Sequence, residues 1–167
     1  MKLTNDYTIP FTGLTIGKHA FEFQLGKAFF EQFEYSEISE GDVFIDVILE
    51  KQSSMMILDF EFEGVIETIC DRCQESVEIE LEGEFRLIVK FGDYTDTNND
   101  EILILGPNEV EVDFTQYFYE YSHLALPSKR VHDSLEECNQ DVIAILKNLK
   151  SESGDDVDPR WGALKDI

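Results

Sequence analysis

The chain has 167 residues, of which 43% are hydrophobic and 13 are Phe, which is too much apolar material for a disordered protein. Its 36 acidic and 13 basic residues give a net charge of −23, which disfavours direct binding to DNA or to an RNA backbone and favours cationic partners. No apolar run approaches the roughly 18–20 residues that cross a bilayer, and three cysteines, an odd number, favour a reducing compartment, so we expect a cytoplasmic protein that does not insert in a membrane.

The first two thirds of the chain are dominated by predicted strands. The first forty residues combine a strand-like stretch, HAFEFQL, with GKAFFEQFEY, which is compatible with a short helix. Three longer segments, 43–49, 57–67 and 77–91, alternate between hydrophobic and polar residues, which is typical of antiparallel strands covered on one side. The short connections EKQSS and CDRCQE predict a meander, and two shorter strands, EILIL and EVEVDF, flank a turn at GPNE.

The solvent side of the predicted meander carries many carboxylates. The residues proposed to bind a partner on this side are Glu61, Glu63, Glu78, Glu80 and Glu82. Like charges on neighbouring strands cost stability, so a cationic partner or other Lys and Arg side chains must relieve them. The alternative is that the acidity only keeps the protein soluble.

After Asp113 the period of the pattern changes to that of a helix. The segment FTQYFYEYSHLAL has aromatic residues at helical spacing and ends before Pro127. A second amphipathic helix is predicted to begin at Ser134, which forms a capping box with Glu137, and to continue to Leu149. Its apolar stripe is expected to pack on the sheet.

These elements predict an α+β fold, in which an antiparallel β-meander sheet is covered on one face by C-terminal helices. We expect residues 1–167 to form a single domain, with 151–167 as a candidate mobile tail. Within this tail, Asp158 and Pro159 are suited to start a further helical turn.

The stretch ICDRCQ places Cys70 and Cys73 at the turn between two predicted strands. A CxxC turn can direct both sulfurs toward one zinc ion, and His132 and Cys138 would complete a Cys₃His set. Two alternatives remain open: the cysteines fill the core or the turn, as buried free cysteines often do, or they form a redox dithiol, although the usual βαβ context is missing. Zinc is therefore the one cofactor that the spacing suggests.

Three cations, Arg72, Lys129 and Arg130, stand near these positions in a chain that has few cations. If the turn and residues 127–138 meet in space, the three form a small basic patch for a phosphate or an acidic partner. Alternatively, each pairs with a nearby carboxylate. The sequence contains no glycine-rich phosphate loop, HExxH or GxSxG motif, and we expect a protein that is not an enzyme.

The order of four motifs, CDRCQE, an aromatic acidic segment, LALPSKRVHDSLEEC and DPRWGALKDI, resembles the YceD family, the large ribosomal RNA subunit accumulation proteins. The resemblance runs from about residue 70 onward. The residues that match its three short motifs are Cys70, Arg72 and Cys73, then Pro127, His132 and Cys138, then Asp158, Pro159, Arg160 and Leu164. Some relatives carry further cysteines after the middle motif. This chain has none, which counts against zinc.

The resemblance implies a non-enzymatic cytoplasmic factor that supports the accumulation of large-subunit ribosomal RNA, in assembly or processing. We expect its acidic side to bind a basic ribosomal protein or an rRNA-processing factor, with rRNA involved only indirectly. Arg160 and Trp161 are further candidate contacts, because their segment is either offered to a partner or docked on the body. The alternatives are a direct RNA-binding or RNA-processing protein and an acidic mimic of nucleic acid.

Overall fold

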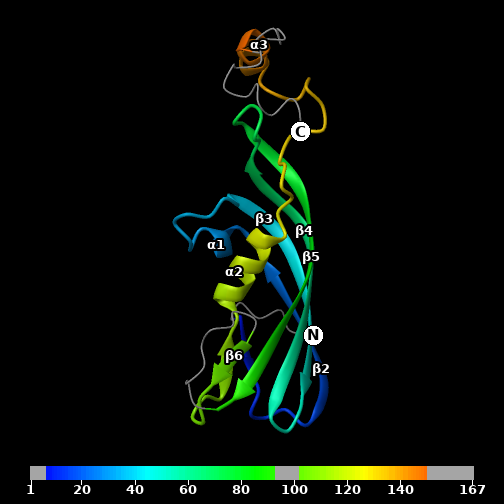
Figure 1. Ribbon diagram of the computed structural model, residues 1–167, viewed down its shortest axis with the longest axis vertical. Helices are drawn as coiled ribbons and strands as arrows, with labels where there is room; N and C mark the ends of the chain where they lie inside the picture. Colours follow the sequence, from blue (N-terminus) through cyan, green and yellow to red (C-terminus); the bar gives the residue numbers. More distant parts are fainter. Residues whose placement is uncertain (1–6, 93–101, 150–167) are drawn as a thin grey trace, which may run out of the picture.

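The computed structural model describes residues 7–92 and 102–149, and Figure 1 shows their arrangement. The elements in chain order are β1 (Thr8–Pro10), β2 (Gly17–Leu25), α1 (Lys27–Phe30), β3 (Glu40–Lys51), β4 (Met55–Ile69), β5 (Ser76–Phe91), β6 (Ile102–Leu105), β7 (Glu111–Asp113), α2 (Thr115–Leu124) and α3 (Gln140–Leu149). The predicted tail 151–167, with Arg160 and Trp161, lies outside the described residues, so a single domain over 1–167 stays a prediction.

Five of the strands form one sheet in the order β2-β3-β4-β5-β6. Neighbouring strands from β2 to β5 are antiparallel, which confirms the predicted meander, whereas β6 runs parallel to β5. The two short strands β1 and β7 pair with each other in a separate antiparallel ladder. The fold is therefore α+β with a mostly antiparallel sheet, as the alternating pattern predicted.

The alternating segments bury one side of the sheet, which we call the inner face. The buried side chains of β3 are Val43, Ile45, Val47 and Leu49. Gly64 of β4 lies opposite β3 at a point where the backbones are close, since a Cβ atom there would lie 2.3 Å from the carbonyl oxygen of Asp42. The period of two in the sequence therefore translates directly into a dry inner face and a wet outer face.

Helix α2 packs on the inner face of the sheet (Figure 1). The ring of Phe118 lies in an aromatic cluster, with its centroid 5.1 Å from that of Phe23 in β2 and 6.1 Å from that of Phe62 in β4. Tyr121 stacks on Phe85 of β5 with centroids 4.4 Å apart. The predicted aromatic helix thus forms, and its rings attach it to three strands of the sheet.

The second predicted helix begins later than the capping box suggested. Helix α3 starts at Gln140, and the side-chain oxygen of Asn139 accepts hydrogen bonds from the backbone N–H groups two and three residues on, at 3.1 and 3.3 Å. Asn139 is therefore the N-cap, and the prediction of Ser134 is wrong. The physical reason is that Cys138 is buried against the β4–β5 turn, which holds the preceding residues in bends.

Helix α3 also lies in a different place from the one expected. It is found beyond the turn between β4 and β5, at one end of the molecule (Figure 1). Its buried residue, Ile143, packs with Cys70, Cys73 and Val77 rather than with the main core. The expected cover of the sheet is thus formed by α2, while α3 packs on the end of the long hairpin.

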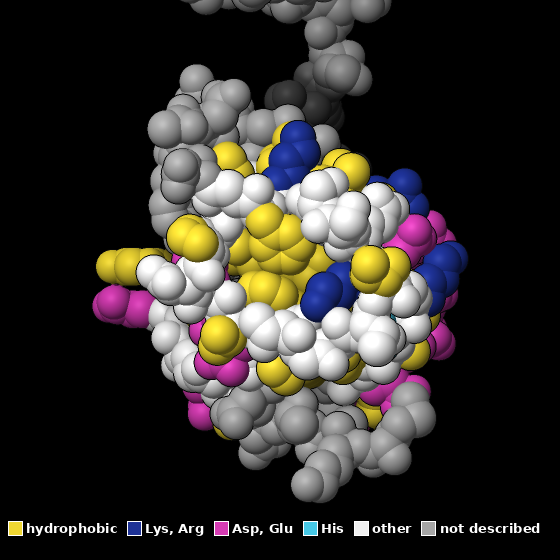
Figure 2. All heavy atoms as spheres, turned by 90° about the horizontal axis from the view of Figure 1, so that it is seen from below, with side chains coloured by type: hydrophobic (Ala, Val, Ile, Leu, Met, Phe, Trp, Pro, Cys, Tyr) yellow, Lys and Arg dark blue, Asp and Glu magenta, His cyan; other side chains and the backbone are white. Residues whose placement is uncertain are grey.

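The opposite end of the molecule exposes part of the core. Figure 2 views this end, where hydrophobic side chains gather at the centre within a ring of backbone and polar atoms. Phe91, the last residue of β5, contacts Phe11 with ring centroids 5.5 Å apart and remains 37% exposed. Among the described residues, no helix has the length and the apolar character needed to cross a membrane.

Candidate metal centre and acidic sheet face

Three cysteines and one histidine meet where the β4–β5 turn contacts the segment before α3. Cys70 and Cys73 come from the turn, and His132 and Cys138 come from the segment. The four ligand atoms all lie within 4.8 Å of one another, and Nδ1 of His132 is 3.7 Å from both the Cys73 and the Cys138 sulfur. The structure therefore brings together the four residues that the sequence proposed as a Cys₃His set.

Local backbone geometry explains how the CxxC motif presents its two sulfurs together. Gln74 adopts a left-handed conformation with φ of 61°, and its N–H donates to the carbonyl oxygen of Cys70 at 2.9 Å. The N–H of Cys70 donates to the carbonyl oxygen of Glu75 at 2.8 Å. These bonds close a tight turn between β4 and β5, and both cysteine side chains are buried on its inner side.

The orientation of His132 is set by a hydrogen bond on the far side of its ring. Nε2 lies 3.1 Å from the carbonyl oxygen of Ser76. A carbonyl oxygen only accepts, so Nε2 carries the proton and Nδ1 presents a lone pair toward the sulfurs. This is the arrangement found for histidines that bind zinc, whose second nitrogen is held by a backbone or carboxylate oxygen.

The environment favours the thiolate form of one cysteine. Burial raises the pKa of the Cys70 thiol, but hydrogen bonds from the backbone N–H groups of Arg72, Cys73 and His132 outweigh burial and lower it to about 6. For Cys138, burial dominates and the pKa of the thiol is raised. Since a metal binds the thiolate, Cys70 is the ligand best prepared for a cation.

The two distances between sulfur and Nδ1 fit a tetrahedral zinc ion. A sulfur about 2.3 Å and a nitrogen about 2.1 Å from the metal, at a tetrahedral angle, lie about 3.6 Å apart. The two observed distances between sulfur and Nδ1 are both 3.7 Å. The donor set, its burial and these two distances therefore agree with a structural Cys₃His site.

Arg72, between the two cysteines of the turn, is directed at the same cluster. Its Nη1 atom donates to the Cys138 sulfur at 3.3 Å. Three thiolates around a Zn²⁺ ion would carry a net negative charge, which the guanidinium group would offset. Arg72 is thus a support of the cluster, rather than a free member of the basic patch that the sequence suggested.

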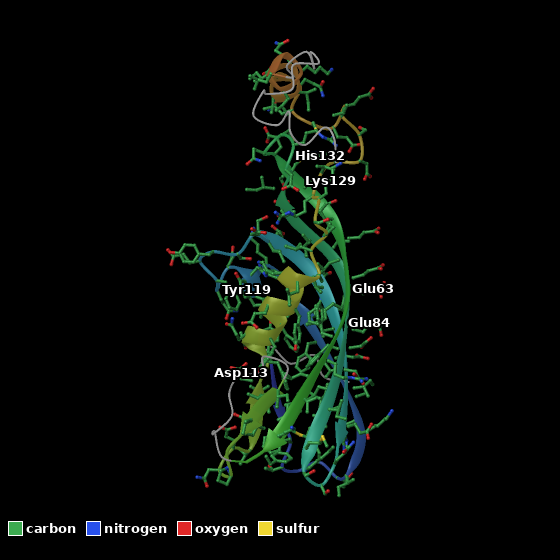
Figure 3. The ribbon with its side chains drawn as sticks, viewed as in Figure 1. Glu63, Glu84, Asp113, Tyr119, Lys129 and His132 are labelled. Atoms are coloured by element: carbon green, nitrogen blue, oxygen red, sulfur yellow. The ribbon has the colours of Figure 1, made fainter. Side chains whose placement is uncertain are left out.

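Arg130 is likewise paired within the molecule. Its guanidinium group forms ion pairs with Glu37 and, at 3.6 Å, with Asp71. Lys129 is exposed beside it, and Figure 3 shows Lys129 and His132 near the same end of the hairpin. Arg130 therefore pairs with nearby carboxylates, as the alternative interpretation of the sequence proposed. Of Arg72, Lys129 and Arg130, only Lys129 is exposed.

The outward side chains of β2 to β5 form what we call the acidic face. Asp46 of β3 lies opposite Glu61 of β4, and Glu61 lies opposite Glu84 of β5. On the other side of the row, Glu22 of β2 lies opposite Asp46. Four exposed carboxylates thus form a continuous row across four strands, which lie about 4.8 Å apart.

Further acidic pairs lie along the same hairpin. Glu63 is opposite Glu82, and Glu67 is opposite Glu78. Figure 3 shows Glu63 and Glu84 pointing away from the side of the sheet that carries α2. The structure places all five glutamates proposed from the sequence, Glu61, Glu63, Glu78, Glu80 and Glu82, at exposed positions of this face.

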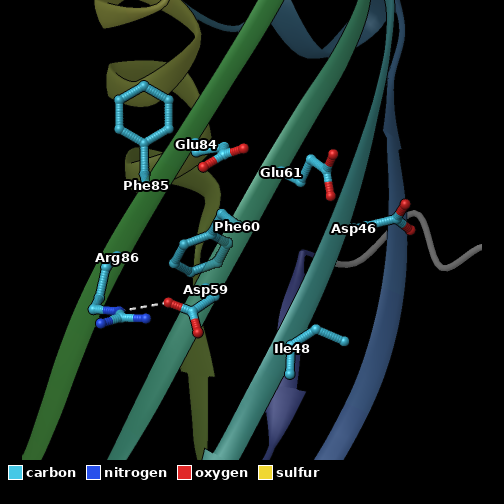
Figure 4. Close-up of a pocket in the computed structure, with 8 residues that line it drawn as sticks. All are labelled: Asp46, Ile48, Asp59, Phe60, Glu61, Glu84, Phe85 and Arg86. Atoms are coloured by element: carbon cyan, nitrogen blue, oxygen red, sulfur yellow. Dashed lines mark hydrogen bonds and ion pairs between the residues drawn. The ribbon is translucent and has the colours of Figure 1, made fainter.

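The acidic face also contains a hollow with an apolar edge. The hollow has a volume of about 520 Å³, and its lining includes Asp46, Ile48, Glu61 and Glu84 (Figure 4). At one side, Arg86 pairs with Asp59 at 2.5 Å. Exposed hydrophobic side chains, Phe44 (52%), Ile48 (40%) and Val65 (44%), interrupt the carboxylates. A ligand for this surface would therefore need both cationic and apolar groups.

Sequence reasoning missed part of this face. Glu22, Asp46 and Glu84 complete the carboxylate row, but only the strand register shows that they are neighbours of Glu61. The alternation of residues assigns each side chain to a face, and it contains no information about which residues face each other across strands. An estimate of hairpin register from the loop lengths could have identified Glu84.

One comparison with known proteins bears on identity. A family model described as "Large ribosomal RNA subunit accumulation protein YceD" matches residues 58–167. No match was found among curated proteins or among solved structures. The matched range contains the complete Cys₃His set and most of the β4–β5 part of the acidic face. Because it spans more than half of the 167 residues, the chain belongs to the YceD family of large ribosomal RNA subunit accumulation proteins.

Proposed function

We propose that this protein is a cytoplasmic, non-enzymatic factor that supports large-subunit rRNA accumulation by binding a basic ribosomal protein or rRNA-processing factor on its acidic face. The observation that carries the proposal is the exposed row from Glu22 through Asp46 and Glu61 to Glu84. Membership of the YceD family supports the link to rRNA, and the charge of the face supports the class of partner.

The electrostatics of the face favour a cationic protein over RNA. At the outward positions of the described strands β2 to β5, carboxylates far outnumber the cations Lys18, Arg86 and Lys90. Carboxylates that face one another across strands repel, and a bound cationic partner relieves this repulsion. The phosphates of RNA would increase it. The exposed Phe44 and Ile48 add apolar contacts that a folded or folding protein can use.

A pull-down from cell extract tests the proposal. The variant Glu61→Gln/Glu63→Gln/Glu82→Gln removes three charges from the face, and the matched control Glu34→Gln/Glu111→Gln/Glu136→Gln removes three exposed charges elsewhere. We expect a basic ribosomal or rRNA-processing protein to bind the wild type and the control, to be lost from the face variant, and to dissociate as salt is raised. Recovery of RNA without protein, or equal binding by both variants, would contradict the proposal.

A cellular measurement connects binding to rRNA. In cells that depend on this protein, the face variant should lower the ratio of large-subunit to small-subunit rRNA, while the control variant should leave it unchanged. Loss of the partner in pull-down together with a normal rRNA ratio would separate binding from the proposed role.

We further propose that Cys70, Cys73, His132 and Cys138 hold one zinc ion with a structural role. Bound zinc would supply a rigid tetrahedral link between the β4–β5 turn and the segment that leads to α3. Four protein ligands leave no open position on the ion for a substrate. This role fits a protein whose activity is binding.

Metal analysis tests the zinc proposal. Native mass spectrometry should show one zinc per chain in the wild type and in the control His19→Ala, and none in Cys73→Ser or His132→Ala. Cobalt(II) substitution should give the absorption bands of a tetrahedral thiolate site in the wild type and in His19→Ala, but in neither cluster variant. Full zinc occupancy in both cluster variants would contradict the assignment of these ligands.

A further inference from the structure

Helix α3 carries an apolar stripe that the described residues leave largely uncovered. Val142, Ile145, Leu146 and Leu149 recur at helical spacing and share one face. Ile145, Leu146 and Leu149 are 57%, 41% and 72% exposed. By contrast, Ile143, on an adjacent face, is only 4% exposed because it packs on the Cys₃His cluster.

Such a stripe normally has a partner. A ten-residue helix is too short to be stable by itself, so its stability depends on burying an apolar face. Ile143 provides a single buried anchor, and the stripe is the larger apolar surface of the helix. Burial of the stripe by a further segment would therefore stabilise the helix.

The segment 150–167, which directly follows α3, has the side chains and the length to do so. Its large apolar residues include Trp161 and Leu164, which are three positions apart. The eleven residues 150–160 reach roughly 36 Å when extended, whereas α3 is about 15 Å long. The segment can thus return along the whole of the helix.

Charge and connectivity favour this segment over a separate molecule. Residues 150–167 include five acidic and three basic side chains, so the acidic face repels them, whereas α3 has one Asp and one Lys. A segment tethered by a short linker is present at an effective concentration of the order of millimolar, far above that of a second chain. The tethered segment is therefore favoured.

We propose that residues 158–167 dock on α3 of the same chain, with Trp161 and Leu164 packed on the stripe of Ile145, Leu146 and Leu149. This contact is independent of the proposed function at the acidic face. It assigns to Trp161 an intramolecular site, which any partner that binds the stripe must displace.

Fluorescence tests the proposal directly, because Trp161 is the only tryptophan of the chain. In the full-length, zinc-loaded protein, Trp161 should emit at shorter wavelength than a peptide of residues 150–167 and be quenched several-fold less by acrylamide. Leu146→Lys and Leu149→Lys should each lower the docking equilibrium about tenfold and shift emission toward that of the peptide. The control Ile16→Lys, at a site that is as exposed as Leu149 and lies at the other end of the sheet, should leave emission unchanged.

Three outcomes would overturn the proposal. Emission of the wild type identical to that of the peptide would show that Trp161 is not docked. A shift that is unaffected by both lysine variants would place Trp161 elsewhere. A shift that disappears on dilution would show that the stripe is covered by a second copy. Unchanged circular dichroism and zinc content in the variants would exclude unfolding as the cause.

Discussion

Asp71 and Arg130 are joined by charge and by two hydrogen bonds, each donated by a backbone N–H group. The N–H of Arg130 donates to the Asp71 carboxylate at 2.7 Å, and the N–H of Asp71 donates to the carbonyl oxygen of Arg130 at 2.7 Å. Asp71 directly follows Cys70 in the CxxC turn, and Arg130 lies two residues before His132. This pairing places the two halves of the Cys₃His set next to each other through contacts of the chain itself.

Replacement of Asp71 should therefore weaken the cluster. We expect Asp71→Ala to lower the free energy of unfolding of this end by about 1–2 kcal/mol, because a carboxylate that accepts a backbone N–H is lost and the partly exposed ion pair adds little. Hydrogen exchange of residues 129–138 and zinc affinity measure the effect. Asp71→Asn retains an acceptor, so its free energy of unfolding should lie between those of the wild type and Asp71→Ala. Equal free energies for the two variants would contradict this account.

The Cys70 thiol should make stability depend on pH in the metal-free protein. Its pKa in the folded state is about 6, below the ordinary value of 9.0. The unfolded state therefore binds more protons between these values, and stability rises with pH. The contribution is complete above about pH 9 and is lost as the pH falls through about 6. Urea unfolding with a chelator, at several pH values, should show this slope in the wild type and a reduced slope in Cys70→Ser.

Removal of one charge from the carboxylate row should stabilise the fold. Glu61 lies between Asp46 and Glu84, so Glu61→Gln removes two repulsive pairs and should raise the free energy of unfolding by about 0.2–1 kcal/mol at low salt. The gain should shrink as salt screens the charges. Glu34→Gln, an exposed residue outside the sheet, serves as the control. A loss of stability in Glu61→Gln would show that the carboxylates are already compensated within the molecule.

Two glycines of the hairpin should differ in their tolerance of alanine. A Cβ at Gly64 would meet backbone atoms, at 2.3 Å from the Asp42 oxygen, and the strands would have to separate. A Cβ at Gly83 would meet side chains, at 2.8 Å from Phe85 and 3.0 Å from Ala125. We expect losses of about 3 kcal/mol or more for Gly64→Ala and about 1–2 kcal/mol for Gly83→Ala. Chemical denaturation measures both, and the reverse order would contradict the strand approach described here.

The sheet could be predicted because the alternation of hydrophobic and polar residues within each strand shows which side chains are buried. The alternation in 43–49 alone identifies which side chains enter the core, and the short connections identify the neighbours. Register is different, because it depends on how two strands align, and one strand does not contain that information. The sequence alone therefore could not predict that Asp46, Glu61 and Glu84 form a row, because this depends on the register of the strands.

The start of helix α3 is a second feature that the sequence did not predict correctly. Periodicity and the capping box at Ser134 both favoured an early start, and both are local signals. The actual start at Asn139 is set by Cys138, whose side chain is buried against a turn that lies 65 residues earlier in the chain. The cluster itself was predictable, because the CxxC spacing and the later His and Cys each carry a recognisable chemistry.

The Cys₃His cluster also has a consequence for the order in which the chain folds. It joins residues 59 positions apart, Cys73 and His132, and thereby encloses β5, β6, β7 and α2 in one loop. During synthesis the turn with Cys70 and Cys73 is made first, and His132 becomes available only after the residues inside the loop have been synthesised. A metal ion held by all four residues would therefore be captured only after β5, β6, β7 and α2 have been synthesised.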